Sequence, residues 1–146
     1  MYINCLITTL NEIDFYRSKF IKLSGEIQTA VPYAKKGEPF IVPSYKFYPS
    51  FLEKQKIELS KFNNNSELIR IIGNCHFELC HVQSKLESYV KYMSSLDQYN
   101  MSLHLLNAMG FKELIDTDAK LFEDAIQMLK NEIVSAQANS SRNINK

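Results

Sequence analysis

The feature that most constrains this sequence is an unbroken row of apolar and semi-apolar residues in its middle third. Successive members are alternately four and three residues apart: Leu68, Ile72, Cys75, Leu79, Val82, Leu86, Tyr89, Met93 and Leu96. This is the period of a helix that packs lengthwise against a partner. We therefore predict a long helix from Asn64 to about Asp97, capped by Asn64 with Glu67 as the reciprocal residue. With 1.5 Å per residue, this helix is about 50 Å long.

A second long helix is predicted over residues 3–30. Its apolar residues recur every seven positions, at Leu6, Ile13, Phe20 and Ile27. Arg17 and Ser24 interrupt the neighbouring row, so the apolar stripe narrows toward the end of the helix. Pro32 is expected to end it, because proline lacks an amide hydrogen and disfavours helical conformation in the residue before it.

All four prolines fall between residues 32 and 49, together with five aromatic residues. So much aromatic surface argues against disorder, and we predict an ordered crossover that lays its rings across the helices. Ser50 and Glu53 form a second capping box, which predicts a short helix reaching about Phe62.

The last third predicts two further helical segments. The first ends at Gly110, a residue suited to a left-handed helix stop. The second is capped by Asp116 or Thr117 and has an inner face made of Phe122, Ala125, Leu129, Ile133 and Ala136. The polar residues 139–146 are expected to form a frayed tail.

These elements predict an all-α protein, a helical bundle of three to four main helices with two long helices and a proline-rich, aromatic crossover. Its 146 residues suit one domain, which we place at 1–138. Three cysteines without framework spacing favour a reducing compartment, so we expect a cytoplasmic protein. No run of 18 apolar residues is present that would suggest a membrane span.

The net charge of +1 gives no basic footprint, so we do not expect nucleic acid as a partner. The four glycines are too scattered for a phosphate-binding loop. Gly73 lies inside the strongest helix pattern, where we expect it to permit the close approach of another element rather than to line a ligand pocket.

A cluster of cysteines and histidines, Cys75, His76, Cys80 and His81, is the main candidate for chemistry. His76 and Cys80 share a helix face, and with His81 they are the candidate metal ligands. Zinc requires four converging ligands, whereas these side chains diverge around the helix. Cys80 and His81 point about 100° apart, which does not suit a nucleophile and its base. We therefore expect no metal, no cofactor and no enzymatic activity.

The order of these parts resembles the soluble region of uncharacterised bacterial proteins that carry one N-terminal transmembrane helix. The resemblance covers residues 10–135 and rests on the long first helix, the aromatic segment 44–52 and the long helix that begins Glu67-Leu68-Ile69. It implies no known chemistry. This sequence departs from the pattern by lacking the membrane segment, although residues 1–11 are uncharged. A removed membrane segment before Met1 and a native start at Met1 both fit this pattern.

Two functions remain open. The first is an interaction or scaffolding module that forms a homodimer, either through the surplus apolar side of the long helix (Ile69, Ile71, Phe77) or through the start of the first helix (Ile3, Leu6, Ile7). The second is a small-molecule binding protein whose aromatic crossover, residues 33–48, covers a pocket between helices. The residues expected to line that pocket are Tyr33, Phe40, Tyr45, Phe47, Tyr48, His76 and Phe77.

Overall fold

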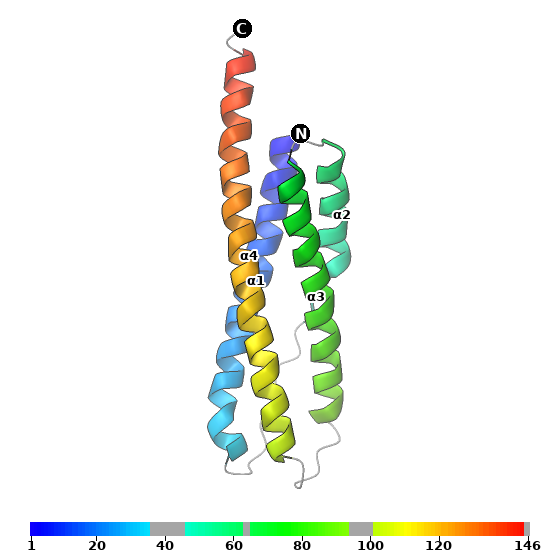
Figure 1. Cartoon of the computed structure of the whole chain (residues 1–146), viewed down its shortest axis with the longest axis vertical. Coiled ribbons are helices and arrows are strands. Elements are labelled where there is room, and N and C mark those ends of the chain that lie inside the picture. The colour runs from blue at the N-terminus through cyan, green and yellow to red at the C-terminus, as the bar shows by residue number, and fades with distance from the viewer. Residues whose placement is uncertain (36–45, 63–64, 94–100, 145–146) are drawn as a thin grey trace.

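A computed structural model describes residues 1–35, 46–62, 65–93 and 101–144 of the chain. Within these ranges the protein consists of four helices and has no strand: α1 (Tyr2–Lys35), α2 (Pro49–Ser60), α3 (Ser66–Met93) and α4 (Met101–Ile144). The predicted all-α helical bundle is therefore confirmed (Figure 1). Three of the helices are long, rather than the two that the sequence pattern predicted.

The four helices alternate in direction, and each packs against its neighbours around the bundle (Figure 1). The most extensive contact joins α1 to α4, while α2 lies against both α1 and α3, and α3 also packs on α4. Within the described residues, α1 and α3 make no close backbone contact, so they occupy opposite corners.

Polar residues on α1 explain this arrangement, because their partners lie on α4. The Ser24 hydroxyl donates to Asp116 Oδ1, and Arg17 Nη2 lies 3.8 Å from Glu123 Oε2. Near the start of α1, the Tyr2 hydroxyl donates to Glu132 Oε1 over 2.8 Å. The two residues that interrupt the apolar stripe of α1 thus face a helix that carries matching groups.

The apolar row of α3 faces the interior as predicted. Its described side chains are all buried: Leu68, Ile72, Cys75, Leu79, Val82 and Leu86. The side chains of Tyr89 and Met93 and the whole of Leu96 lie outside the described residues.

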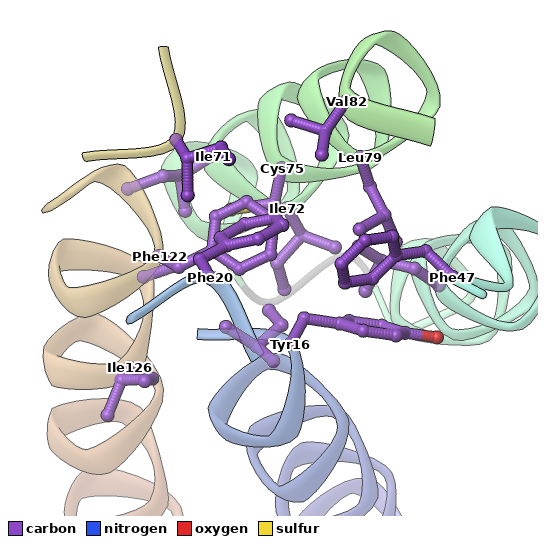
Figure 2. Packing of buried hydrophobic residues seen from close by; sticks show 14 of the residues in the cluster. Tyr16, Phe20, Phe47, Ile71, Ile72, Cys75, Leu79, Val82, Phe122 and Ile126 are labelled. Carbon is purple, nitrogen blue, oxygen red and sulfur yellow. The ribbon is translucent and has the colours of Figure 1, made fainter. Parts of the chain in front are cut away.

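Aromatic rings fill the middle of the core (Figure 2). The rings of Phe20 on α1 and Phe122 on α4 meet edge to face, with centroids 4.9 Å apart. Phe47, just before α2, packs on Phe20 with centroids 5.3 Å apart. Such aromatic pairs add about 0.5–1.5 kcal/mol beyond the burial of their surface. This cluster joins three segments that are far apart in the sequence.

Two prolines behave differently from one another. Pro32 lies inside α1, which continues to Lys35, so the prediction that it ends the helix is wrong. In the last turn it removes only the hydrogen bond to the Gln28 carbonyl, and the preceding turns remain intact. Pro49 instead begins α2, at a position where the missing amide hydrogen has no partner to lose.

The predicted helix caps are also corrected. Tyr48 is the N-cap of α2 and makes no side-chain capping bond, so the predicted capping box of Ser50 and Glu53 does not form. At α3 the cap is Asn65, whose Oδ1 accepts the Leu68 amide at 3.1 Å. The predicted cap, Asn64, lies outside the described residues, and Glu67 forms an ion pair with Arg70.

α4 is one continuous helix of 44 residues, not two segments separated at Gly110. Asp116 and Thr117 do not cap a new helix either: Asp116 accepts from Lys112 over 2.8 Å, and the Thr117 hydroxyl donates to the Glu113 carbonyl. The helix also continues through 139–144, so the domain boundary that the sequence suggested at residue 138 falls inside α4. Figure 1 shows its C-terminal end extending beyond the other helices.

No helix among the described residues combines the length and the apolar character needed to cross a membrane.

Replacing Gly110 by alanine should raise the free energy of unfolding by about 0.5–1 kcal/mol, because glycine inside a helix costs that much relative to alanine. A methyl group at Gly110 meets nothing within 4 Å, and the same holds at Gly25 on α1, which provides the matched control. Urea unfolding of both variants measures the effect. A loss of stability at Gly110 alone would instead support a left-handed helix stop.

Leu79→Ala should lower the free energy of unfolding by about 2–5 kcal/mol, through lost burial and the cavity that remains. Leu79 is completely buried at the centre of α3. Ser84→Ala on the exposed side of the same helix should change stability by less than about 0.5 kcal/mol. Similar values for the two variants would contradict the placement of α3.

Candidate functional site

The residues expected to line a ligand pocket do not converge where the structure describes them. Phe47 is buried in the core, whereas Tyr48 and Phe77 are exposed. His76 is partly buried and faces α2, where its Nε2 lies 4.0 Å from Glu53 Oε2. The side chain of Tyr33 and the whole of Phe40 and Tyr45 lie outside the described residues.

Phe47 has a structural role at the end of the predicted crossover, of which residues 36–45 lie outside the described residues. Its amide donates to Gln83 Oε1 on α3 over 2.8 Å. The next residue, Tyr48, accepts a 3.1 Å hydrogen bond from the Tyr16 hydroxyl on α1 through its backbone carbonyl. The segment before α2 is thus tied to α1 and α3, and it lays one aromatic ring across the core.

Of the cysteines and histidines, Cys75 is excluded from chemistry by its position. It is completely buried on the α3 row, and burial, with the nearby carboxyl groups of Asp118 and Glu78, raises the pKa of its thiol to about 12. A thiol in this state is a small core residue rather than a nucleophile or a metal ligand at neutral pH.

Of the remaining members of the cluster, His76 and Cys80 lie together, whereas His81 lies apart from them. His76 Nε2 lies 3.7 Å from Cys80 Sγ, one helical turn along α3 and on the side next to α2. His81 turns elsewhere, with its Nδ1 3.9 Å from Glu78 Oε2. Among the described residues, no three potential ligands of the histidine, cysteine or carboxylate type converge on one point. The candidate ligands His76, Cys80 and His81 are therefore not brought together.

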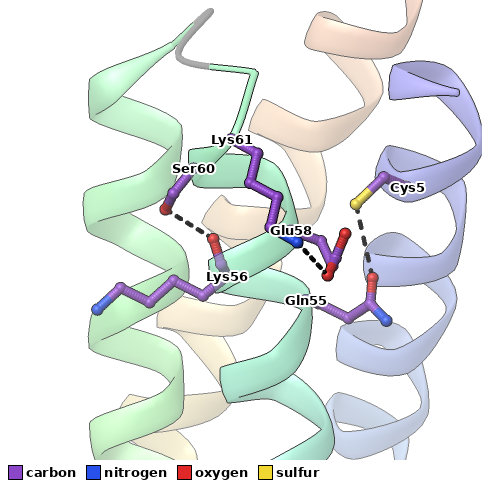
Figure 3. A network of polar contacts seen from close by, with 6 residues as sticks. All are labelled: Cys5, Gln55, Lys56, Glu58, Ser60 and Lys61. Atoms are coloured by element: carbon purple, nitrogen blue, oxygen red, sulfur yellow. Dashed lines mark hydrogen bonds and ion pairs between the residues drawn. The ribbon is translucent and has the colours of Figure 1, made fainter.

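Cys5 on α1 belongs to a polar contact that seats α2. Its thiol donates to Gln55 Oε1 over 3.7 Å (Figure 3). The Thr9 hydroxyl also lies 3.5 Å from that oxygen. At the C-cap of α2, Lys61 Nζ donates to Glu58 Oε1 over 3.0 Å. Burial, followed by the charge of Glu58, raises the pKa of the Cys5 thiol. These contacts stabilise the position of the helix and bring no reactive group to the surface.

A buried aspartate, Asp118, that lies near the partly exposed Glu78 is a titratable site that the sequence analysis missed. Asp118 on α4 is only 3% exposed, and its Oδ2 has no hydrogen-bond partner. Burial, and then the neighbouring carboxyl group of Glu78 on α3, raise the pKa of Asp118 to about 8. At neutral pH this carboxyl group is therefore largely protonated in the core.

The sequence did contain a signal for this pair. Extending the inner face of the last helix backward from Phe122 by one turn reaches Asp118, and Ile115 and Phe111 continue the same row. An aspartate at a core position of a helix stripe is rare unless it is paired or neutral. The predicted start of this helix at Asp116 or Thr117 places Asp118 in a first turn, where an acidic residue is common, rather than on the inner face.

The two surfaces expected to form a dimer interface are only partly exposed. Leu6 is completely buried, so the start of the first helix does not offer it to a partner, although Ile7 beside it is exposed. On α3, Ile71 is buried and Ile69 packs against the core, which leaves Phe77 as the exposed apolar residue of that set.

Comparison with known proteins gives no match, whether with protein-family models, with curated proteins or with solved structures.

Asp118→Asn should remove a pH dependence of stability. In the unfolded chain Asp118 loses its proton near pH 3.8, whereas in the folded protein it keeps the proton to about pH 8. The free energy of unfolding therefore contains a contribution that falls as the pH rises from about 4 to about 8. Urea unfolding across this range should show the Asn variant gaining stability relative to the unaltered chain as the pH increases.

Asp116→Asn is the matched control with the opposite sign. Burial acts to raise the pKa of Asp116, but hydrogen bonds from Lys112 and Ser24 outweigh it and lower the pKa. The ionised carboxylate of Asp116 stabilises the fold above the pKa that this group has in the unfolded chain, and the stabilisation is lost in acid. The Asp116→Asn variant should therefore lose stability relative to the unaltered chain at neutral pH. Parallel pH curves for Asp118→Asn and the unaltered chain would show that Asp118 ionises normally.

Proposed function

We propose that this chain is an interaction module that self-associates through the outer side of α2. The observation that carries the proposal is the distribution of apolar side chains on this short helix and its N-cap. It buries Leu52 and Leu59, yet the large apolar side chains of Tyr48, Phe51 and Ile57 are 52–57% exposed. We call Tyr48, Phe51 and Ile57 the α2 surface.

The helices on either side of α2 also expose aromatic residues. α2 packs between α1 and α3, and each of these carries an exposed phenylalanine, Phe15 on α1 and Phe77 on α3. The Tyr48 and Phe51 rings are already in contact, with centroids 5.8 Å apart. Grouped apolar side chains on a surface are typical of a site for protein contact.

A second copy of the chain is the occupant that this surface favours. In a two-fold interface the same surface of both chains meets, and the two copies of a helix can run antiparallel. A charged residue of one chain can then lie opposite a residue of opposite charge in the other chain. The α2 surface is flanked by exposed charges of both signs, Glu53 and Lys54. In an antiparallel pairing of two α2 helices, each glutamate can approach a lysine of the mate. The three free cysteines suit a reducing compartment, and we place the module in the cytoplasm.

The module accounts for the described aromatic residues better than a small-molecule binding site does. A ligand pocket needs side chains that converge on one cavity. Phe47 instead fills the core, while Tyr48 and Phe77 face outward. The exposed rings are available to a large, flat partner.

Light scattering should give twice the 16.9 kDa mass of the chain at micromolar concentration. The double variant Phe51→Ser and Ile57→Ser should be monomeric, because it removes apolar area from the centre of the proposed interface. Val134→Ser provides the matched control, since Val134 is 66% exposed but lies on α4, and this variant should remain dimeric.

Two results would contradict the proposal. A mass of 16.9 kDa for the unaltered chain across a hundredfold range of concentration would exclude the dimer. A dimer that survives the double variant would exclude the α2 surface as its interface.

A further inference from the structure

On the outer side of the contact between α2 and α3, a thiol, an imidazole and a carboxylate lie next to one another in space. Cys80 is exposed, and its Sγ lies 3.7 Å from His76 Nε2. Glu53 Oε2, from α2, lies 4.0 Å from the same nitrogen. A cysteine thiol beside an imidazole that can accept its proton is the usual environment of a reactive cysteine.

The other two cysteines have surroundings that suppress reaction. Cys75 is completely buried in the apolar row of α3, and burial raises its pKa to about 12. Cys5 is partly buried, its thiol donates to Gln55 on α2, and burial raises its pKa. Only Cys80 combines exposure with a neighbouring imidazole, so the structure predicts one reactive thiol among the three.

We propose that Cys80 is a site of modification by small disulfides, with His76 as the group that accepts its proton. The Cys80 sulfur attacks one sulfur of the disulfide, so that a new sulfur–sulfur bond forms and the original one breaks. The other half leaves as a thiolate and takes up the proton that His76 removed from Cys80. Electrons balance because the disulfide is the oxidant: it is reduced to one free thiol while Cys80 is oxidised to a mixed disulfide.

Glu53 has a positioning role in this step. When His76 holds the proton it is an imidazolium, and a carboxylate 4.0 Å away stabilises that charge. Glu53 and His76 belong to the same chain, so the site can also be tested on the monomeric double variant Phe51→Ser and Ile57→Ser, in which no lysine of a second copy competes for Glu53.

The experiment uses the full chain and two probes, the chromogenic disulfide 5,5′-dithiobis(2-nitrobenzoic acid) and oxidised glutathione. At pH 7 one equivalent should react in a fast phase, and peptide mass mapping after the glutathione reaction should place the mixed disulfide on Cys80. Cys80→Ser should abolish the fast phase, whereas Cys5→Ser and Cys75→Ser should retain it. Fast labelling of Cys5 or Cys75 would overturn the proposal.

The role of His76 is tested with a matched pair of variants. A free thiol is only a few per cent thiolate at neutral pH, so removing its proton acceptor in His76→Gln should slow the fast phase by about tenfold. His81→Gln should not change the rate, because His81 lies beside Glu78 and not beside Cys80. Equal rates for the two variants would show that His76 does not assist the reaction.

Discussion

The bundle depends first on the packing of α1 along α4. These two helices make the most extensive contact in the described structure, and the meeting of Phe20 and Phe122 lies within it. The polar residues of α1 also find partners there, since Ser24 bonds to Asp116 and Tyr2 to Glu132. Once this pair is fixed, α3 can close the core only from the opposite side. The apolar row of α3 therefore packs between α2 and α4 rather than along α1.

The fold class and the inner face of α3 could be predicted because they follow from a period that runs without interruption through many residues. The ends of the helices could not. A cap or a proline changes the energy by only a few hydrogen bonds, and tertiary packing can override it. Pro32 and Gly110 both lie inside helices because α1 and α4 stabilise each other along their length. The sequence shows the local cost of such residues but not the contact that offsets it.

The candidate site shows the same division between local and tertiary information. The shared face of His76 and Cys80 could be predicted, because residues four apart on a helix are neighbours. The approach of Glu53 could not, since it depends on how α2 docks against α3. Gly73 was correctly expected to permit a close approach, which is made by the side chain of Lys56. The pairing of Asp118 with Glu78 likewise required knowledge of which helices are adjacent.

The short helix α2 connects these observations. It has only 12 residues, and it is anchored by Leu52 and Leu59 in the core and by Gln55, which accepts from Cys5 on α1. Too few inward positions remain to bury Phe51 and Ile57 as well, so the outer side of α2 keeps an apolar surface. Its edge toward α3 carries Glu53, which approaches His76. A small element that is covered on one side only thus supplies both the proposed contact surface and one of the groups around the exposed thiol.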